Sequence, residues 1–233
     1  MAALCAWLAL GCGTASNDAP AAAADTAAEL AIEETAGSPT PARPVVLFVG
    51  TSLTAGAGLA AEQSFPALVQ RRIDEAGLAY RVVNAGVSGD TSAGGLRRIE
   101  WLLRLPVAVM ILELGANDML RGQSAAMMRD NLRSILDLTL EAMPDVQLVI
   151  AGMRAAPNLG ATYAREFDSV FPQLATEYDA ALIPFLLEGV ASVRGLNQPD
   201  GIHPTADGHE ILANTVWQVL APLLRTPEES LSR

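Results

Sequence analysis

The stretch Val45-Val46-Leu47-Phe48-Val49-Gly50-Thr51-Ser52-Leu53 places five consecutive apolar residues directly before a glycine and two hydroxyl residues. An unbroken apolar run of this length is typical of a parallel strand that is buried on both faces. We therefore predict a central strand that ends at Gly50, followed by a small, glycine-rich segment outside the core. Ser52 then lies at the carboxyl end of the strand, where open α/β sheets bind their ligands. A single serine there is more often an ordinary turn residue, so the rest of the sequence must decide.

The remaining chain alternates between short apolar runs and segments with the periodicity of a helix. This alternation predicts right-handed crossovers and a three-layer α/β/α sandwich. Its five-stranded parallel sheet is expected to have the flavodoxin-like order 2-1-3-4-5. Beyond the first strand, strands are predicted at 80–85, 107–114, 146–151 and 181–184, and helices at 65–76, from Thr91 or Ser92 to Pro106, from Ser124, at 163–178, and from Thr205 to about Leu224.

Composition limits the classes of partner. The chain has 233 residues, of which 51% are hydrophobic, and this suits one globular domain with a sizeable core. The net charge of −11 argues against a nucleic acid held through its phosphates. All fifteen basic residues are arginine, which excludes Schiff-base chemistry and a serine–lysine dyad.

The N-terminal region differs from the rest of the chain. Residues 1–12 are apolar, and Ala9-Leu10-Gly11-Cys12 resembles a bacterial lipoprotein cleavage site, although no positively charged segment precedes it. The alternative is a hydrophobic N-terminus without a targeting role. Residues 13–42 carry a charge of −5 and lack apolar periodicity, which predicts a disordered acidic tether. We expect a domain at 43–226, a tail at 227–233, and an exported protein that is periplasmic or anchored at the membrane through Cys12.

Cysteine and histidine usage restricts the chemistry of the domain. Both cysteines, Cys5 and Cys12, lie within the first twelve residues. The domain is therefore predicted to contain no disulfide, cysteine nucleophile or cysteine metal ligand. Its two histidines, His203 and His209, make a zinc site improbable, and we expect no metal or organic cofactor.

Polar segments follow three successive strands: Gly50-Thr51-Ser52, Ser88-Gly89-Asp90 and Gly115-Ala116-Asn117-Asp118. Because parallel strands share their carboxyl edge, we expect all three on one rim of the sheet. Asp200 and His203 come directly before the last helix, at a spacing that lets the carboxylate turn back onto the ring. Together these residues provide a nucleophile, a base and an orienting group, the roles needed for acyl transfer.

These segments resemble the sequence blocks of the SGNH, or GDSL, hydrolases over about residues 44–224. Any one block is weak support, but four in the same order at plausible spacing are specific. The similarity is greatest to the bacterial multifunctional thioesterase/lysophospholipase/arylesterase branch. The motifs of that branch match Ser88–Thr91, Asn117–Gly122 and Asp200–Pro204, in addition to Gly50-Thr51-Ser52-Leu53.

The resemblance implies a serine esterase with Ser52 as nucleophile, His203 as base and Asp200 as its orienting carboxylate. It assigns the oxyanion contacts to the backbone N–H groups of Ser52 and Gly89 and to the side-chain amide of Asn117. A glycine lets a backbone amide approach the substrate without a Cβ in the way. An asparagine amide is a neutral donor that meets developing negative charge without titrating.

One position departs from the family pattern. Thr51 stands where family members usually carry aspartate. Because the resemblance gives Thr51 none of the catalytic roles, we expect activity to survive. Any contribution that the family's aspartate makes to positioning or substrate preference is absent from this chain.

Other polar residues are given structural roles. His209 is expected to be a solvated or capping side chain, and Asp90 and Asp118 are expected to hold their loops. Arg154, Asn158 and the segment Met119–Gln123 fall in rim loops, where exposure to solvent is more common than a place in an acyl pocket.

The expected substrate is a small acyl ester or thioester. The nearest alternative within the family is a carbohydrate O-acetylesterase. From a different class, the same fold is compatible with a non-catalytic flavodoxin-like binding module whose glycine loops hold a phosphate. Against that reading, the chain has no phosphate-binding lysine and its first loop is not a Gly-x-Gly-x-x-Gly sequence.

Overall fold

The computed structural model describes residues 43–224. These residues contain a five-stranded, fully parallel sheet in the order β2-β1-β3-β4-β5, so the predicted topology is confirmed. The predictions for residues 1–12, 13–42 and 227–233, including Cys5 and Cys12, lie outside the described residues. The strands are β1 (Val45–Gly50), β2 (Arg81–Gly86), β3 (Val107–Glu113), β4 (Gln147–Ala151) and β5 (Ala181–Ile183).

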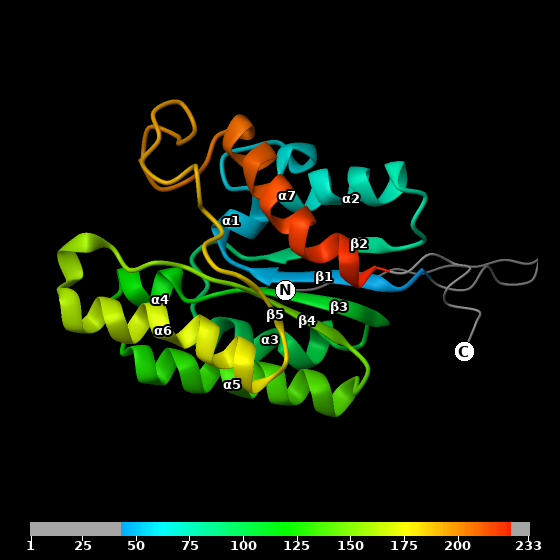
Figure 1. Cartoon of the computed structure of the whole chain (residues 1–233), viewed down its shortest axis with the longest axis horizontal. Helices are drawn as coiled ribbons and strands as arrows, with labels where there is room; N and C mark the ends of the chain where they lie inside the picture. The colour runs from blue at the N-terminus through cyan, green and yellow to red at the C-terminus, as the bar shows by residue number, and fades with distance from the viewer. Residues whose placement is uncertain (1–42, 225–233) are drawn as a thin grey trace, which may run out of the picture. The chain divides into compact units, whose positions relative to one another are not determined.

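Helices cover both faces of the sheet (Figure 1). One face carries α2 and α7, which pack against each other, and the opposite face carries α3, α5 and α6. The helices are α1 (Ser52–Ala55), α2 (Phe65–Glu75), α3 (Ser92–Leu102), α4 (Ala116–Leu120), α5 (Ala125–Ala142), α6 (Ala161–Glu177) and α7 (Ala206–Leu220), with short 3₁₀ turns at Ala61–Gln63, Pro157–Leu159 and Ala221–Leu223.

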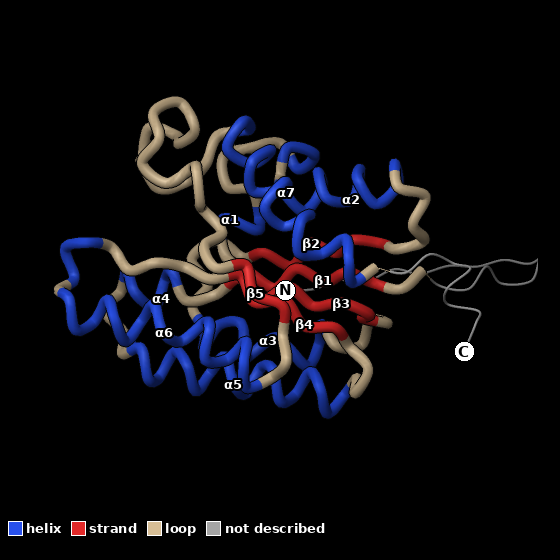
Figure 2. Tube along the Cα trace, viewed as in Figure 1, coloured by secondary structure: helices blue, strands red, loops and turns tan. Residues whose placement is uncertain are grey.

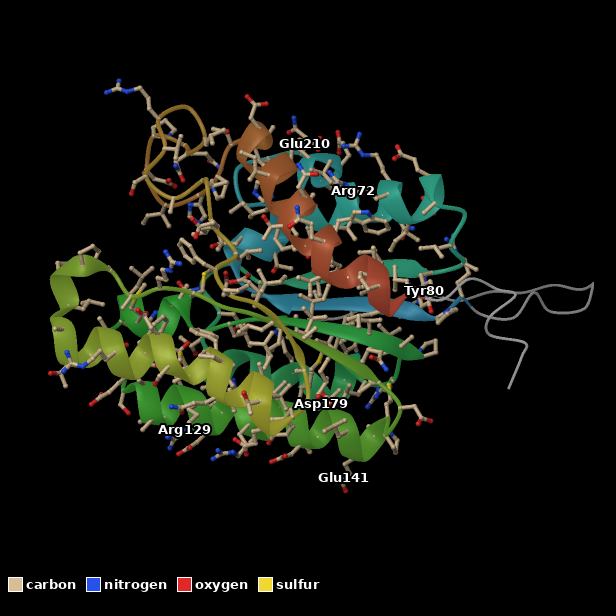
Figure 3. All side chains as sticks on the ribbon, in the orientation of Figure 1. Arg72, Tyr80, Arg129, Glu141, Asp179 and Glu210 are labelled. Atoms are coloured by element: carbon tan, nitrogen blue, oxygen red, sulfur yellow. The ribbon has the colours of Figure 1, made fainter. Side chains whose placement is uncertain are left out.

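Burial follows the hydrophobic pattern of the sequence. Every residue of β1 is buried, as expected for the central strand of a sheet that is covered on both faces. The outer side of α5 carries charged side chains: Arg129 and Glu141 extend away from the sheet (Figure 3). The chain between the strands therefore forms amphipathic helices whose apolar sides complete the core.

Local sequence signals set the start of the longer helices. The hydroxyl groups of Thr91, Ser124 and Thr205 each accept a hydrogen bond from a backbone N–H in the first turn of α3, α5 and α7, respectively. The cap at Thr205 was expected from the sequence, Thr91 was one of two candidates with Ser92, and the start of α5 was expected at or near Ser124. Each satisfies a donor that the helix itself leaves unpaired.

Two expectations about local structure were wrong. The segment after β1 is not a loop outside the core, because it forms the short helix α1, in which Leu53 and Thr54 are buried. The last helix ends at Leu220 rather than about Leu224. Pro222 lacks an N–H group and its ring clashes with the preceding turn, so the chain continues as a 3₁₀ turn instead.

The loops that follow the strands gather at the carboxyl edge of the sheet (Figure 2). The long connection between β5 and α7 lies on the same side, together with α1 and α4 (Figure 1). The fold thereby collects segments from distant parts of the sequence along one rim. Within residues 43–224, no helix is both long enough and apolar enough to cross a bilayer.

Candidate active site

Ser52 is the first residue of α1, directly after the central strand. Thr51 is the N-cap of this helix, and its hydroxyl accepts a hydrogen bond from the N–H of Leu53. The strand-to-helix turn holds Ser52 at the rim while its neighbours Thr51 and Leu53 are buried. The partly exposed hydroxyl of Ser52 is thus held between two buried residues.

His203 and Asp200 meet Ser52 in one chain of contacts. The Nε2 atom of His203 lies 2.9 Å from the Oγ of Ser52, and its Nδ1 lies 2.6 Å from Oδ2 of Asp200. The structure therefore brings together the three residues that the sequence assigned to one site. These distances fall within the reach expected of a nucleophile, a base and an orienting group.

The environment of Asp200 settles the tautomer of His203. Hydrogen bonds from the ring of His203 and from the backbone N–H groups of His203 and Ile202 lower the pKa of Asp200 to about 2. The carboxylate is therefore ionised near neutral pH and only accepts hydrogen bonds. Nδ1 of His203 therefore donates to it, and in the neutral ring Nε2 is the acceptor for the Ser52 hydroxyl.

The three expected oxyanion donors line the same cavity. The N–H groups of Ser52 and Gly89 donate to no other atom within residues 43–224. Gly89 has a φ of 81°, a left-handed conformation that a side chain would strain. The Nδ2 of Asn117 donates one hydrogen to the carbonyl of Asp90 at 2.9 Å. That bond orients the amide, whose second hydrogen remains for a ligand.

An ion pair connects the nucleophile strand with the loop of Gly89. The guanidinium of Arg98 in α3 lies 2.7 Å from the carboxylate of Asp90 and 3.1 Å from the carbonyl oxygen of Gly50. Arg98 thus joins the end of β1 to the residue after Gly89. Asp90 holds its loop, as expected. Asp118 was also expected in a loop but lies in α4, and its carboxylate accepts hydrogen bonds from Ser92 at the start of α3.

Gln198 connects the histidine loop with the segment after α1. Its Nε2 donates to the carbonyl oxygens of Ala57 at 2.7 Å and Pro204 at 2.9 Å. Its backbone N–H also donates to the carbonyl of His203. Sequence reasoning missed this side chain, because Ala57 is 141 positions away and both partners are backbone carbonyls, which carry no sequence signal.

A cavity of about 720 Å³ opens beside Ser52 and His203. Away from these two residues its walls are mainly apolar and include Met119, Leu120, Met153, Phe185 and Ile202. Arg154 also lies in the wall, with its guanidinium 4.6 Å from the centre of the Phe185 ring. Asn158 and the segment Arg121–Gln123 do not line the cavity.

Of the two roles expected for His209 from the sequence, the structure shows the capping role. The side chain is not solvated, since only 1% of its surface is exposed. Its Nδ1 accepts a hydrogen bond from the backbone N–H of Phe65 at 3.0 Å, so it caps the start of α2 rather than its own helix. Burial lowers the pKa of His209 to about 4. The ring is therefore a neutral structural group.

No group of three histidine, cysteine or acidic side chains within residues 43–224 is arranged to hold a metal ion. A second hollow of about 740 Å³ lies away from Ser52, at the opposite end of the strands, where Val107, Gln147 and Asp145 contribute to its lining. Of the two cavities, the one lined by Ser52 and His203 is therefore the candidate active site.

Known proteins resemble this chain over most of its length. The sequence profile of the GDSL-like Lipase/Acylhydrolase family matches residues 48–211. Esterase TesA of Pseudomonas aeruginosa is 41% identical over 184 residues, which cover 78% of this chain and 90% of that protein. Thioesterase 1/protease 1/lysophospholipase L1 of Escherichia coli is 36% identical, with 78% and 86% covered.

A solved structure shows the same fold. AlinE4, described as an SGNH-hydrolase family esterase, superposes with a TM-score of 0.64 at 45% identity, covering 78% of this chain and 97% of that one. The profile match spans most of the described residues, and the similarity to whole proteins is well above the level that indicates fold alone. The chain therefore belongs to the GDSL-like lipase/acylhydrolase family and is an enzyme that hydrolyses ester bonds.

Proposed function

We propose that this enzyme hydrolyses carboxylic esters and thioesters through a Ser52–His203–Asp200 triad and an acyl-enzyme on Ser52. The observation that carries the proposal is the continuous chain of contacts from the Ser52 hydroxyl through the His203 ring to Asp200. A non-catalytic binding module gives this alignment no role. The oxyanion contacts are assigned to the N–H groups of Ser52 and Gly89 and to the Asn117 amide.

The reaction follows from the tautomer of His203. Nε2 takes the proton of Ser52 as Oγ attacks the substrate carbonyl, and the ionised Asp200 stabilises the imidazolium that forms. The carbonyl oxygen becomes negative and is stabilised by the donors of Ser52, Gly89 and Asn117. His203 then gives its proton to the leaving alcohol or thiol. Water, deprotonated by the same nitrogen, attacks the acyl-enzyme, and His203 returns the proton to the Ser52 Oγ as the bond to the acid breaks.

The cavity supports an acyl group larger than acetyl. Its volume of about 720 Å³ and its apolar wall suit a hydrocarbon chain, because burying apolar surface contributes about 25 cal/mol per Å². A carbohydrate O-acetylesterase instead requires polar groups that match sugar hydroxyls, and the wall away from the triad offers few. The proposed substrates are therefore acyl esters and thioesters of the kinds named for the two bacterial relatives.

A chain-length series tests this assignment. We expect kcat/KM for p-nitrophenyl esters to rise from acetate to medium-chain acyl groups as more of the apolar wall is covered. An acyl-CoA and a lysophospholipid of the preferred chain length, assayed in parallel, distinguish thioester from phospholipid substrates. Maximal activity on acetyl esters, together with release of acetate from an acetylated sugar, would instead support the O-acetylesterase.

We further propose that the enzyme is exported and held at a bacterial membrane through a lipid on Cys12. The support is the sequence Ala9-Leu10-Gly11-Cys12, followed by an acidic segment of thirty residues before the domain. A buried acyl chain contributes about 0.8 kcal/mol per methylene group to membrane attachment.

A further inference from the structure

A buried carboxyl group that the proposed reaction does not use lies directly beneath the nucleophile. Glu113 is the last residue of β3 and is 1% exposed. Burial of a carboxyl without partners is costly, so its contacts must compensate for the loss of water. Its contacts involve two residues of the nucleophile segment, Thr51 and Thr54.

The carboxyl accepts hydrogen bonds from four groups of these two residues, the backbone N–H and the hydroxyl of each. The Oε2 atom lies 2.9 Å from the backbone nitrogen of Thr51, 3.3 Å from that of Thr54 and 2.8 Å from the Thr54 hydroxyl. The Thr51 hydroxyl lies 3.0 Å from Oε1. Glu113 thus holds the chain both immediately before Ser52 and two residues after it, over one turn of α1.

The absence of a side chain at Gly50 leaves room for the Glu113 carboxyl. Gly50 pairs with Glu113 in the register of β1 and β3. A Cβ at position 50 would lie 2.6 Å from Oε2 of Glu113 and 2.0 Å from the Thr54 hydroxyl, so only glycine leaves room for the contact. The carboxyl is therefore enclosed between the end of the central strand and the first turn of α1.

Burial raises the pKa of Glu113, whereas its hydrogen bonds from Thr51 and Thr54 act in the opposite direction. In either protonation state the two backbone N–H groups need an acceptor, because α1 itself offers none in its first turn. Glu113 is the acceptor for both Thr51 and Thr54.

We propose that Glu113 is a positioning residue for the nucleophile: by fixing Thr51 and Thr54, it sets the direction of the Ser52 hydroxyl and of the Ser52 N–H. The inference rests on the proposed function of Ser52. Ser52 itself has one side-chain partner, His203, and its N–H has none within residues 43–224. The alignment of both groups is thus supplied by the two anchored neighbours.

The first experiment replaces the acceptor. Glu113→Leu removes the acceptor of all four donor groups. Glu113→Gln keeps an oxygen that accepts from the two N–H groups and places an NH₂ group beside the Thr51 hydroxyl oxygen.

The readout is the rate at which Ser52 reacts with a p-nitrophenyl phosphonate, measured per folded molecule, together with kcat and KM for a short ester. We expect Glu113→Leu to lower the phosphonylation rate and kcat by about 10- to 100-fold with KM nearly unchanged, as small misplacements of a reacting group do. Glu113→Gln should restore most of both rates.

A milder pair of variants covers the case in which Glu113→Leu does not fold. Thr54→Val removes one donor to Glu113 without changing the side-chain volume. Thr139→Val removes an equally buried hydroxyl in α5, which bonds the carbonyl of Ile135 and does not touch the catalytic loops. We expect both variants to lower the melting temperature, but only Thr54→Val to slow phosphonylation.

The results separate this inference from the proposed function. If Thr54→Val and folded Glu113→Leu react with the phosphonate at the wild-type rate, or if Glu113→Gln is as slow as Glu113→Leu, the positioning role is wrong. If Ser52→Ala retains activity, the proposed function itself fails, whatever the Glu113 variants do.

Discussion

The Nε2 atom of His203 lies 2.9 Å from the Oγ of Ser52, although 151 positions separate the two residues in the sequence. Ser52 follows the central strand and His203 precedes the last helix. Parallel topology brings the two loops to one edge of the sheet. Gln198 also joins the histidine loop to the carbonyl of Ala57 after α1.

Asn117→Ala should lower kcat about 10²- to 10³-fold with little change in KM. The amide is held by the Asp90 carbonyl and is expected to meet the oxyanion only as charge develops. Steady-state kinetics on one p-nitrophenyl ester measure both constants. An increase in KM with kcat unchanged would reassign Asn117 to ground-state binding.

The pH profile of kcat/KM should rise through the titration of a single histidine, because His203 must be neutral to accept the serine proton. Neither Asp200 nor His209 accounts for this rising limb of the pH profile. The pKa of Asp200 is lowered to about 2 by its hydrogen bonds, and burial lowers the pKa of His209 to about 4. His209→Gln should keep the limb in place. Loss of the limb in that variant would identify His209 as the base.

His209 should instead control acid stability. The unfolded chain takes up a proton at this residue as the pH falls through 6.5, whereas the folded protein keeps the ring neutral down to about pH 4. The contribution of His209 to the free energy of unfolding is therefore complete above pH 6.5. On the order of 3 kcal/mol of that free energy is lost as the pH falls from 6.5 to 4. Denaturant unfolding of wild type and His209→Gln measures this. The variant should show a shallower loss of unfolding free energy across that window, and equal slopes would contradict the assignment.

Cys12→Ser should release the enzyme from the membrane without changing its activity. The prediction follows from placing the lipid on Cys12 and all proposed catalytic groups within residues 43–224. Fractionation of an expressing bacterium, with ester hydrolysis assayed in each fraction, tests it. Recovery of the wild-type chain in the cytoplasm with residues 1–12 attached would mean that this segment is not a signal.

Much of the fold could be predicted because its signals are local. The fully apolar β1 and the hydroxyl caps at Thr91, Ser124 and Thr205 each depend on a few adjacent residues. The strand order followed from the alternation of strands and helices. The site residues were found through blocks of sequence that a known family shares.

The missed features depend on contacts across the fold. His209 shares its face of α7 with Leu212, Ala213 and Val216, a spacing that indicates burial and was not weighed against its polarity. Glu113 is a carboxylate at the end of the most apolar strand, and such a position indicates a buried charged group with specific partners. The partners Thr51 and Thr54 could not be identified from the sequence, because only the register between β1 and β3 brings them next to Glu113.

The central claim is that Ser52 carries the acyl group. The most direct measurement is mass spectrometry of the enzyme quenched during turnover of a p-nitrophenyl ester, combined with the turnover rates of Ser52→Ala and His203→Ala. The account predicts an acyl adduct on the peptide that contains Ser52, and a loss of several orders of magnitude in turnover for both variants without a change in fold. Near-normal turnover by a folded Ser52→Ala variant, or an acyl adduct on another residue, would contradict it.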